Sequence, residues 1–211
     1  MPGKKIKTRP PLGVQLHNRE TLYSGFLEVD QYEVSHELFG GGWSEVLERE
    51  VMHRKEIAAL LPFDPERQEV VLIEQFRVGA WAGDWPYPWL LECIAGVMEA
   101  GESAGEVAVR EAEEEAGCRV LELELIGRFF TTPGGSSELV NLFCGRIDAT
   151  GLGGIHGLAD EGENIKASVW SLPDVLALVE DGRICNAKTL VALQWLALNH
   201  PRLTSNWCTV S

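Results

Sequence analysis

The sequence predicts an α/β protein built on a mixed sheet, with a small N-terminal β unit in front of it. Residues 21–38 alternate loosely between apolar and polar side chains, which favours strands. From Glu56 onward the apolar runs become denser, as in IAALLPF and EVVLIEQF, and such runs are typical of buried strands. Helix signals follow these strands. We therefore expect an N-terminal β unit over residues 1–54 and an α/β domain over residues 55–211.

The N-terminal unit is expected to consist of short strands. The apolar positions within residues 21–38 suffice for one or two strands. Three glycines at residues 40–42 break this pattern, and another strand is expected over residues 43–51.

The larger domain is expected to alternate strands with helices. Residues 89–94 (WLLECI) follow a loop rich in Trp, Pro and Gly and predict a strand. Ser103 and Glu106 form a capping box, and Gly117 stands where a glycine would end a helix, so a helix is expected from Ser103 to Ala116. Three further strands are expected at residues 121–131, 139–147 and 166–172. A helix opened by Pro173 follows them, and a last helix is expected at residues 187–199, before Pro201.

Composition and charge exclude several classes of function. The chain has 211 residues with 18 Lys+Arg against 32 Asp+Glu, a formal net charge of −14, and 45% hydrophobic residues, which suffices for a substantial core. Proteins that neutralise nucleic-acid phosphates need a surplus of basic side chains, so we expect no nucleic-acid partner. No apolar run approaches the roughly 20 residues of a membrane-spanning helix, and the basic start lacks the apolar core of a secretion signal. The five cysteines have no C-x-x-C spacing, which favours reduced thiols, and we expect a cytoplasmic protein without a membrane partner.

A dense cluster of glutamates is the main chemical signal. Between Glu92 and Glu115 the chain carries many glutamates and a single cation, Arg110. On a helix, Glu111, Glu114 and Glu115 fall on one face, and like charges three or four residues apart destabilise a helix. A hard divalent cation such as Mg²⁺ would reverse this effect, because it binds several oxygen ligands and shares them with substrate phosphates. The alternative is a solvated acidic face without a function.

The spacing of the residues around this cluster decides between these two interpretations. It resembles the Nudix box, G-x5-E-x7-R-E-U-x-E-E-x-G-U, where U is a bulky aliphatic residue. The fixed positions are filled by Gly96, Glu102, Arg110, Glu111, Glu114, Glu115 and Gly117. The departures are Ala112 and Cys118 at the U positions; both are apolar, and we expect them to pack beneath the helix.

Resemblance to the Nudix family implies a loop-helix-loop held in an α/β/α sandwich. It also implies hydrolysis of a nucleoside diphosphate linked to another group, with Mg²⁺ or Mn²⁺ as the cofactor. The implied metal ligands are Glu111, Glu115 and the carbonyl oxygen of Ala95. Glu102 and Arg110 would orient the helix and its carboxylates, and Glu114 would be a supporting ligand or a partner of the ligands.

The flanking sequence resembles the ADP-ribose pyrophosphatase subgroup of this family along nearly the whole chain. The matching segments are ETLYSGF, LLPFDPERQEVVLIEQFR, PWLLE-x3-G, TTPGGSSE, GIHGLADEGENI and NAKTLVALQWLALNH. Pro133, sixteen residues after Gly117, is a further marker of the subgroup. The resemblance implies that ADP-ribose is split into AMP and ribose 5-phosphate by an activated water.

The same resemblance implies a homodimer that exchanges its N-terminal β units, so that both chains build each site. The partner would hold the adenosine end with Phe26, Leu27, Arg49 and Glu50, where the ring of Phe26 can stack on a purine. The other implied substrate-binding residues are Arg54 and Arg77 for phosphate or ribose oxygens, Val97, and Thr132, Pro133, Gly134 and Glu138 around the terminal ribose. Without the resemblance, a surface ion pair would be the preferred explanation of each arginine, and core packing that of Phe26.

The reaction needs a base, and the family places it on the glycine-rich segment 151–162. Glu161 is the first choice, and Glu163 is a third carboxylate ligand of the metal or a reserve base. The sequence does not separate these two, and Asp160 is also within reach. The glycines would let the segment close over the substrate as a lid, whereas the alternative is an acidic surface loop.

Two alternative functions stay open. The chain could cleave another nucleoside diphosphate sugar, since the box does not select the substrate. It could instead bind ADP-ribose without hydrolysis and act as a sensor. The filled acidic positions of the box favour the enzyme, because sensors commonly have a degraded box.

Overall fold

The computed structural model describes residues 13–158 and 162–208. These residues form two compact units. The first holds the described residues up to Arg54 together with residues 132–137, and the second holds residues 55–131 and those from 138 onward. Within these described ranges, no helix combines the length and the apolar character needed to cross a membrane.

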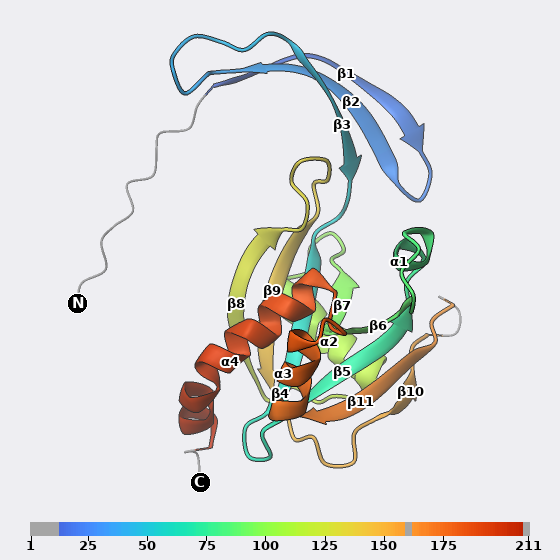
Figure 1. Cartoon of the computed structure of the whole chain (residues 1–211), viewed down its shortest axis with the longest axis vertical. Helices are drawn as coiled ribbons and strands as arrows, with labels where there is room; N and C mark the ends of the chain where they lie inside the picture. Colours follow the sequence, from blue (N-terminus) through green and yellow to red (C-terminus); the bar gives the residue numbers. More distant parts are fainter. Residues whose placement is uncertain (1–12, 159–161, 209–211) are drawn as a thin grey trace, which may run out of the picture. The chain divides into compact units, whose positions relative to one another are not determined.

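The first unit is a three-stranded antiparallel sheet in the order β1–β2–β3, drawn in blue in Figure 1. Its strands are β1 (Val14–Ser24), β2 (Glu28–His36) and β3 (Leu47–His53). The sequence placed the start of the first strand at residue 21, which is wrong: backbone pairing with β2 extends it back to Val14. Every residue of β1 is exposed, so its polar and apolar side chains give no burial pattern to read.

Residues 132–137 pack against β3 through backbone hydrogen bonds. The N–H of Met52 donates to the carbonyl of Gly135 at 2.9 Å, and the N–H of Ser137 donates to the carbonyl of Met52 at 3.1 Å. This loop therefore belongs to the first unit, although its neighbours in sequence belong to the second.

The second unit is built on a mixed eight-stranded sheet. Its main path runs β10–β11–β5–β4–β9–β8, with β6 paired to β5 and β7 paired to β4. The β4–β9 pair is parallel and the others are antiparallel. The strands are β4 (Ile57–Asp64), β5 (Glu69–Phe76), β6 (Trp89–Glu92), β7 (Ile94–Val97), β8 (Glu122–Phe130), β9 (Leu139–Arg146), β10 (Gly154–His156) and β11 (Ile165–Ser171).

Helices cover both faces of this sheet. Helix α2 (Ala104–Ala116) lies on one face, and α3 (Leu172–Glu180) and α4 (Ala187–Trp207) lie on the other, as Figure 1 shows. A separate apolar core fills each interface. Because β4 lies between the two cores, all eight of its residues are buried. The α/β class and the sandwich expected from the sequence are confirmed.

Helix α4 runs farther than the sequence indicated. We expected it to end before Pro201, but it continues through the proline to Trp207. Beyond the proline, Leu203 and Trp207 are buried in the core. Burial of two such side chains stabilises the fold by roughly 1.5–3 kcal/mol each, which offsets the about 3 kcal/mol that an interior proline costs.

The predicted strand over residues 89–94 is also wrong, because it is two strands. The chain leaves β5 after Glu92 and pairs with β4 from Ile94 onward. Between them, the buried N–H of Cys93 donates to the hydroxyl of Thr189 at 2.9 Å instead of joining a strand ladder. A short helix that the sequence did not indicate, α1 (Val78–Ala82), follows β5.

Candidate active site

Helix α2 is held in place at both ends by the local signals that the sequence shows. The Ser103 hydroxyl accepts the N–H of Glu106, and the Glu106 carboxylate accepts the N–H of Ser103, so the predicted capping box is confirmed. At the other end, Gly117 adopts the left-handed conformation with φ of 62°. Ala112 and Cys118 are buried beneath the helix as expected. Of the box glutamates on α2, Glu115 is buried beside these apolar residues, and Glu111 and Glu114 are partly buried.

Gly96 makes room for the Glu111 carboxylate. A Cβ atom at residue 96 would lie 1.8 Å from Glu111 Oε1, closer than any two atoms can approach without a bond. Glycine at this point of β7 therefore permits the carboxylate to lie against the strand backbone. Burial raises the pKa of Glu111 above its ordinary value, although the charge of Arg110 opposes the shift.

Glu115 is the most deeply buried carboxylate of the helix. Its Oε2 atom accepts the N–H of Ala95 at 3.1 Å, which links α2 to β7. Burial raises the pKa of Glu115 to about 8, and the negative charges of Glu111 and Glu163 add to the shift. Ionisation of Glu115 is therefore unfavourable by itself, and a cation beside the carboxylate would favour it.

Arg110 connects the glutamates of the box. Its Nη1 atom lies 2.8 Å from Glu111 Oε1 and 3.0 Å from Glu114 Oε2, and its Nε atom lies 3.7 Å from Glu102 Oε1. Glu102 also accepts the N–H of Glu99 at 2.8 Å. These contacts fit the expectation that Arg110 and Glu102 orient the carboxylates.

Glu163 lies on the loop that precedes β11, and its charge acts on Glu111 and Glu115. Its Oε2 atom accepts the N–H of Leu158 at 3.1 Å, and the N–H of Gly157 donates to the carbonyl of Glu114 at 3.4 Å. The part of the predicted lid that precedes residue 159 includes strand β10. Glu161, our first choice for the base, and Asp160 lie outside the described residues.

Arg77 has a partner that the sequence did not indicate. Its Nε and Nη2 atoms donate to the two oxygens of Glu92 at 3.1 and 2.8 Å. Glu92 is buried, whereas 37% of the Arg77 side chain is exposed. The positive charge of Arg77 also acts on Glu115 and Glu163, so it lies near the carboxylates. Its predicted contact with phosphate or ribose stays a prediction.

The other predicted substrate residues are divided between the two units. In the first unit, Phe26 stands at the β1–β2 turn and is 94% exposed, and the Arg54 guanidinium lies over its ring at 5.8 Å from the ring centre. Leu27 adjoins it in this turn. The same unit holds Arg49, Glu50, Thr132, Pro133 and Gly134, and the second unit holds Val97 and Glu138. Their roles are not decided by this placement.

A second acidic group occurs in the first unit. Ligand atoms of Glu28, Asp30 and His53 lie within 4.8 Å of one another. However, the Arg19 guanidinium bonds directly to the buried Asp30 carboxylate, and His53 Nε2 lies 3.0 Å from the same oxygen. Because Arg19 already supplies the positive charge, we assign no metal to this group.

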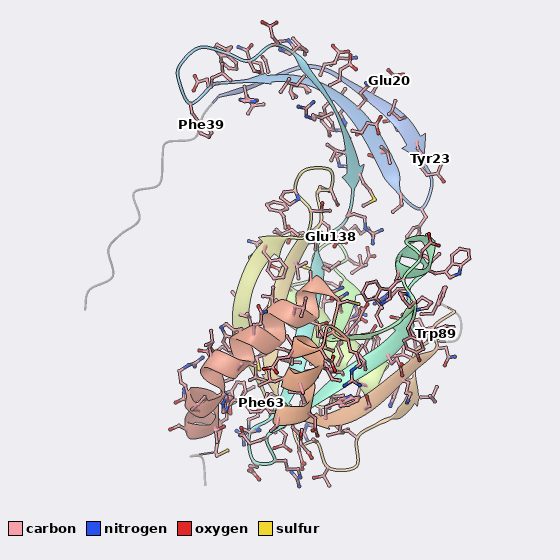
Figure 2. The ribbon with its side chains drawn as sticks, viewed as in Figure 1. Glu20, Tyr23, Phe39, Phe63, Trp89 and Glu138 are labelled. Atoms are coloured by element: carbon pink, nitrogen blue, oxygen red, sulfur yellow. The ribbon has the colours of Figure 1, made fainter. Side chains whose placement is uncertain are left out.

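An aromatic cavity lies apart from the predicted site residues. It has a volume of about 580 Å³ and is bordered by Trp85, Tyr87 and Trp89, the last of which is labelled in Figure 2. The carboxylates of α2 do not line it. No function was predicted for the tryptophan-rich loop from the sequence, and the cavity alone indicates none.

The carboxylates of α2 are of the chemical type that binds a divalent cation, although the ligand atoms of Glu111, Glu115 and Glu163 do not all lie within 4.8 Å of one another. Glu111, Glu115 and Glu163 offer carboxylate oxygens, and hard cations such as Mg²⁺ prefer oxygen ligands. The pKa values of Glu111 and Glu115 are raised chiefly by burial, and a bound cation would favour the ionised form of both carboxylates. The carbonyl of Ala95 belongs to the residue whose N–H binds Glu115, and it could complete the set.

An α/β/α sandwich that carries this loop-helix-loop and its glutamates defines a Nudix domain. The family model described as NUDIX domain matches residues 52–193, and the chain belongs to this family. The ADP-ribose pyrophosphatase of Escherichia coli (strain K12) is 48% identical over 194 residues, which are 92% of each chain. The ADP-ribose pyrophosphatase of Haemophilus influenzae is 39% identical over 196 residues, which are 92% of this chain and 90% of the relative.

Two further comparisons concern substrate and fold. The GDP-mannose pyrophosphatase of Cronobacter sakazakii is 38% identical over 151 residues, which are 71% of this chain and 78% of the relative. A solved structure described as an ADP compounds hydrolase superposes with a TM-score of 0.65 at 23% identity, covering 90% of this chain and 97% of that one. This likeness shows the fold alone.

Proposed function

We propose that the protein hydrolyses the diphosphate of ADP-ribose to AMP and ribose 5-phosphate, with Mg²⁺ or Mn²⁺ as its cofactor. The observation that carries the choice of substrate is the 48% identity to an ADP-ribose pyrophosphatase over 92% of both chains. The carboxylates of Glu111, Glu115 and Glu163, whose charges act on one another, support the chemistry.

Glu111, Glu115, Glu163 and the carbonyl of Ala95 would hold the cation. When bound, such a cation neutralises phosphate charge and lowers the pKa of water. Arg110 keeps Glu111 and Glu114 in place through its ion pairs. Glu115 is tied to β7 by the Ala95 N–H, which fixes the orientation of its carboxylate.

Proton removal from the attacking water is assigned to Glu161. This residue lies outside the described part of the chain, so the assignment depends on the family resemblance. Glu163 is the reserve, because its charge already acts on Glu111 and Glu115. Comparison of Glu161→Gln with Glu163→Gln separates them: loss of kcat with intact metal binding identifies the base.

We also propose a homodimer in which exchanged N-terminal units complete each site. The 94% exposure of Phe26 and the exposure of all of β1 support a partner for this unit, and Figure 2 shows Tyr23 projecting from β1. Phe26, Leu27, Arg49 and Glu50 would then hold the adenosine. Sedimentation tests this arrangement: a monomer at micromolar concentration would contradict it.

The remaining assignments are those of the terminal ribose and the diphosphate. Residues 132–134 and Glu138 would meet the terminal ribose, while Arg54, Arg77 and Val97 would meet the diphosphate or its neighbouring ribose. We place the protein in the cytoplasm, and its five cysteines, all of them free thiols in the structure, are compatible with a reducing compartment.

A substrate panel tests the proposed function. ADP-ribose, other ADP-sugars and GDP-mannose are incubated with Mg²⁺ or with EDTA, and the products are separated by chromatography. We expect metal-dependent AMP formation, fastest from ADP-ribose. Faster cleavage of GDP-mannose would favour the alternative of another nucleoside diphosphate sugar, which the 38% identical GDP-mannose pyrophosphatase supports. Tight ADP-ribose binding without cleavage would indicate a sensor.

A further inference from the structure

We propose that Glu92 is a positioning residue, which fixes the guanidinium of Arg77 so that its remaining N–H groups bind the diphosphate of the substrate. The inference extends the proposed function, since it assumes that Arg77 meets a phosphate. It assigns a purpose to a buried carboxylate that lies outside the Nudix box.

The geometry of the pair leaves donors free. Arginine has five N–H donors, and the Nε and one Nη2 donor of Arg77 are used on Glu92. Both oxygens of Glu92 take part, so the contact is bidentate and holds the plane of the guanidinium as well as its position. The three remaining N–H donors point in other directions within the guanidinium plane, and they stay available for a second anion.

The position of the pair directs those donors. The antiparallel pairing of β5 with β6 places Glu92 opposite Ile73, and the side chain of Arg77, which directly follows β5, reaches the Glu92 carboxylate. Glu92 is 1% exposed and Arg77 is partly exposed, so the carboxylate forms the buried base and the guanidinium reaches toward solvent. The charge of Arg77 acts on Glu115 and Glu163, which places it beside the candidate metal ligands.

The backbone beside Glu92 is also fixed. The N–H of the next residue, Cys93, donates to the buried hydroxyl of Thr189, which itself bonds to Asn186 at the start of α4. Glu92 therefore lies at a well-anchored end of β6, and its carboxylate can hold the long side chain of Arg77. A buried ion pair of this kind is weak evidence for a role in stability alone, because desolvation of the carboxylate offsets much of the attraction.

The test compares Glu92→Gln with a matched pair elsewhere. Gln keeps the shape of the side chain but removes the charge and one acceptor. Glu124→Gln is the control, because Glu124 makes a similar bidentate pair with Arg202 between β8 and α4. We expect kcat/KM of Glu92→Gln to fall roughly 10- to 100-fold, chiefly through a higher KM, while Glu124→Gln stays within about twofold.

A double variant and a spectroscopic readout separate positioning from simple loss of fold. Arg77→Lys combined with Glu92→Gln should be no worse than Arg77→Lys alone, because Glu92 acts through Arg77. Additive losses would overturn the proposal, as would a fall in kcat at unchanged KM. In wild-type protein, NMR should show a slowly exchanging Arg77 Nε proton that persists when ADP-ribose is added in EDTA.

The NMR experiment applies even where Glu92→Gln fails to fold. An Arg77 Nε proton that exchanges as fast as that of free arginine would contradict the proposal. Failure of the proposed function is seen separately, because it appears in the substrate panel of the wild-type protein. The kinetic comparison is then made with whichever nucleoside diphosphate sugar that panel identifies.

Discussion

Gly96 and Glu111 occupy the same small space: a Cβ atom at residue 96 would lie 1.8 Å from the Glu111 carboxylate oxygen. At the proposed metal site, this glycine therefore leaves the space that the Glu111 carboxylate occupies. Gly96→Ala should displace the carboxylate and lower Mg²⁺ affinity and activity by roughly 10- to 100-fold or more. Calorimetric titration with Mg²⁺ measures the affinity.

Gly127→Ala is the control for this change. Nothing lies within 4 Å of a Cβ atom at Gly127, which is also in a strand of the second unit. Its Mg²⁺ affinity should equal that of the wild type. Normal Mg²⁺ binding by Gly96→Ala would show that the position of Glu111 does not matter for the metal.

Glu115→Gln should separate stability from metal binding. Burial raises the pKa of Glu115 to about 8, so the metal-free fold keeps a proton at neutral pH that the unfolded chain has lost. A neutral glutamine removes this cost, and the metal-free variant should melt at or above the wild-type temperature at pH 8. Mg²⁺ should raise the melting temperature of the wild type and leave that of the variant unchanged.

Equal stabilisation of both proteins by Mg²⁺ would contradict this account of Glu115. Thermal melts with Mg²⁺ and with EDTA provide the measurement. Glu113→Gln is a suitable control, since this exposed glutamate is on the same helix and outside the fixed positions of the box.

Asp64 should make the fold sensitive to acid. Burial opposes its ionisation, but hydrogen bonds from the backbone of Ala149, Arg67 and Glu66 prevail and hold the pKa of Asp64 below its ordinary value of 3.8. A lowered pKa stabilises the fold above the ordinary value, and this contribution is lost as the pH falls through the lowered one.

Asp64→Asn should therefore lower the free energy of unfolding by about 2 to 4 kcal/mol at pH 7. Its stability should also depend less on pH than that of the wild type between about pH 4 and the lowered pKa. Urea unfolding at several pH values measures both effects. Parallel curves for the two proteins would assign the acid sensitivity to other groups.

Two leucines of α4 test whether the helix truly packs beyond Pro201. Leu203 is fully buried and Leu198 is 84% exposed. Leu203→Ala should cost about 2 to 5 kcal/mol in urea unfolding, whereas Leu198→Ala should stay within about 0.5 kcal/mol. Similar values for the two variants would mean that the end of the helix is not docked.

The features that the sequence predicts correctly are local. Ser103, Glu106 and Gly117 mark the ends of α2 through contacts within a few residues, so their pattern can be read directly. The Gly96–Glu111 contact joins a strand to a helix, and the sequence analysis predicted no such contact, although both residues hold fixed positions of the box. The burial of each glutamate likewise could not be predicted from the spacing.

The features that were missed depend on distant packing. The end of α4 was predicted from Pro201, but burial of Leu203 and Trp207 outweighs the local cost. The ion pair of Arg77 with Glu92 requires the pairing of β5 with β6, and the split of residues 89–94 requires β4 as a second partner. The residues of β1 that precede residue 21 are all exposed, so they have no alternation of buried and exposed side chains from which an earlier start of the strand could have been predicted.

The central claim is that the carboxylates of α2 form a metal centre that cleaves ADP-ribose. Its most direct test is product analysis of ADP-ribose with wild type and with Glu111→Gln, each in Mg²⁺ and in EDTA. We predict equal amounts of AMP and ribose 5-phosphate from the wild type in Mg²⁺, and almost none in EDTA or from the variant. Equal AMP formation in EDTA, or full activity of Glu111→Gln, would contradict the account.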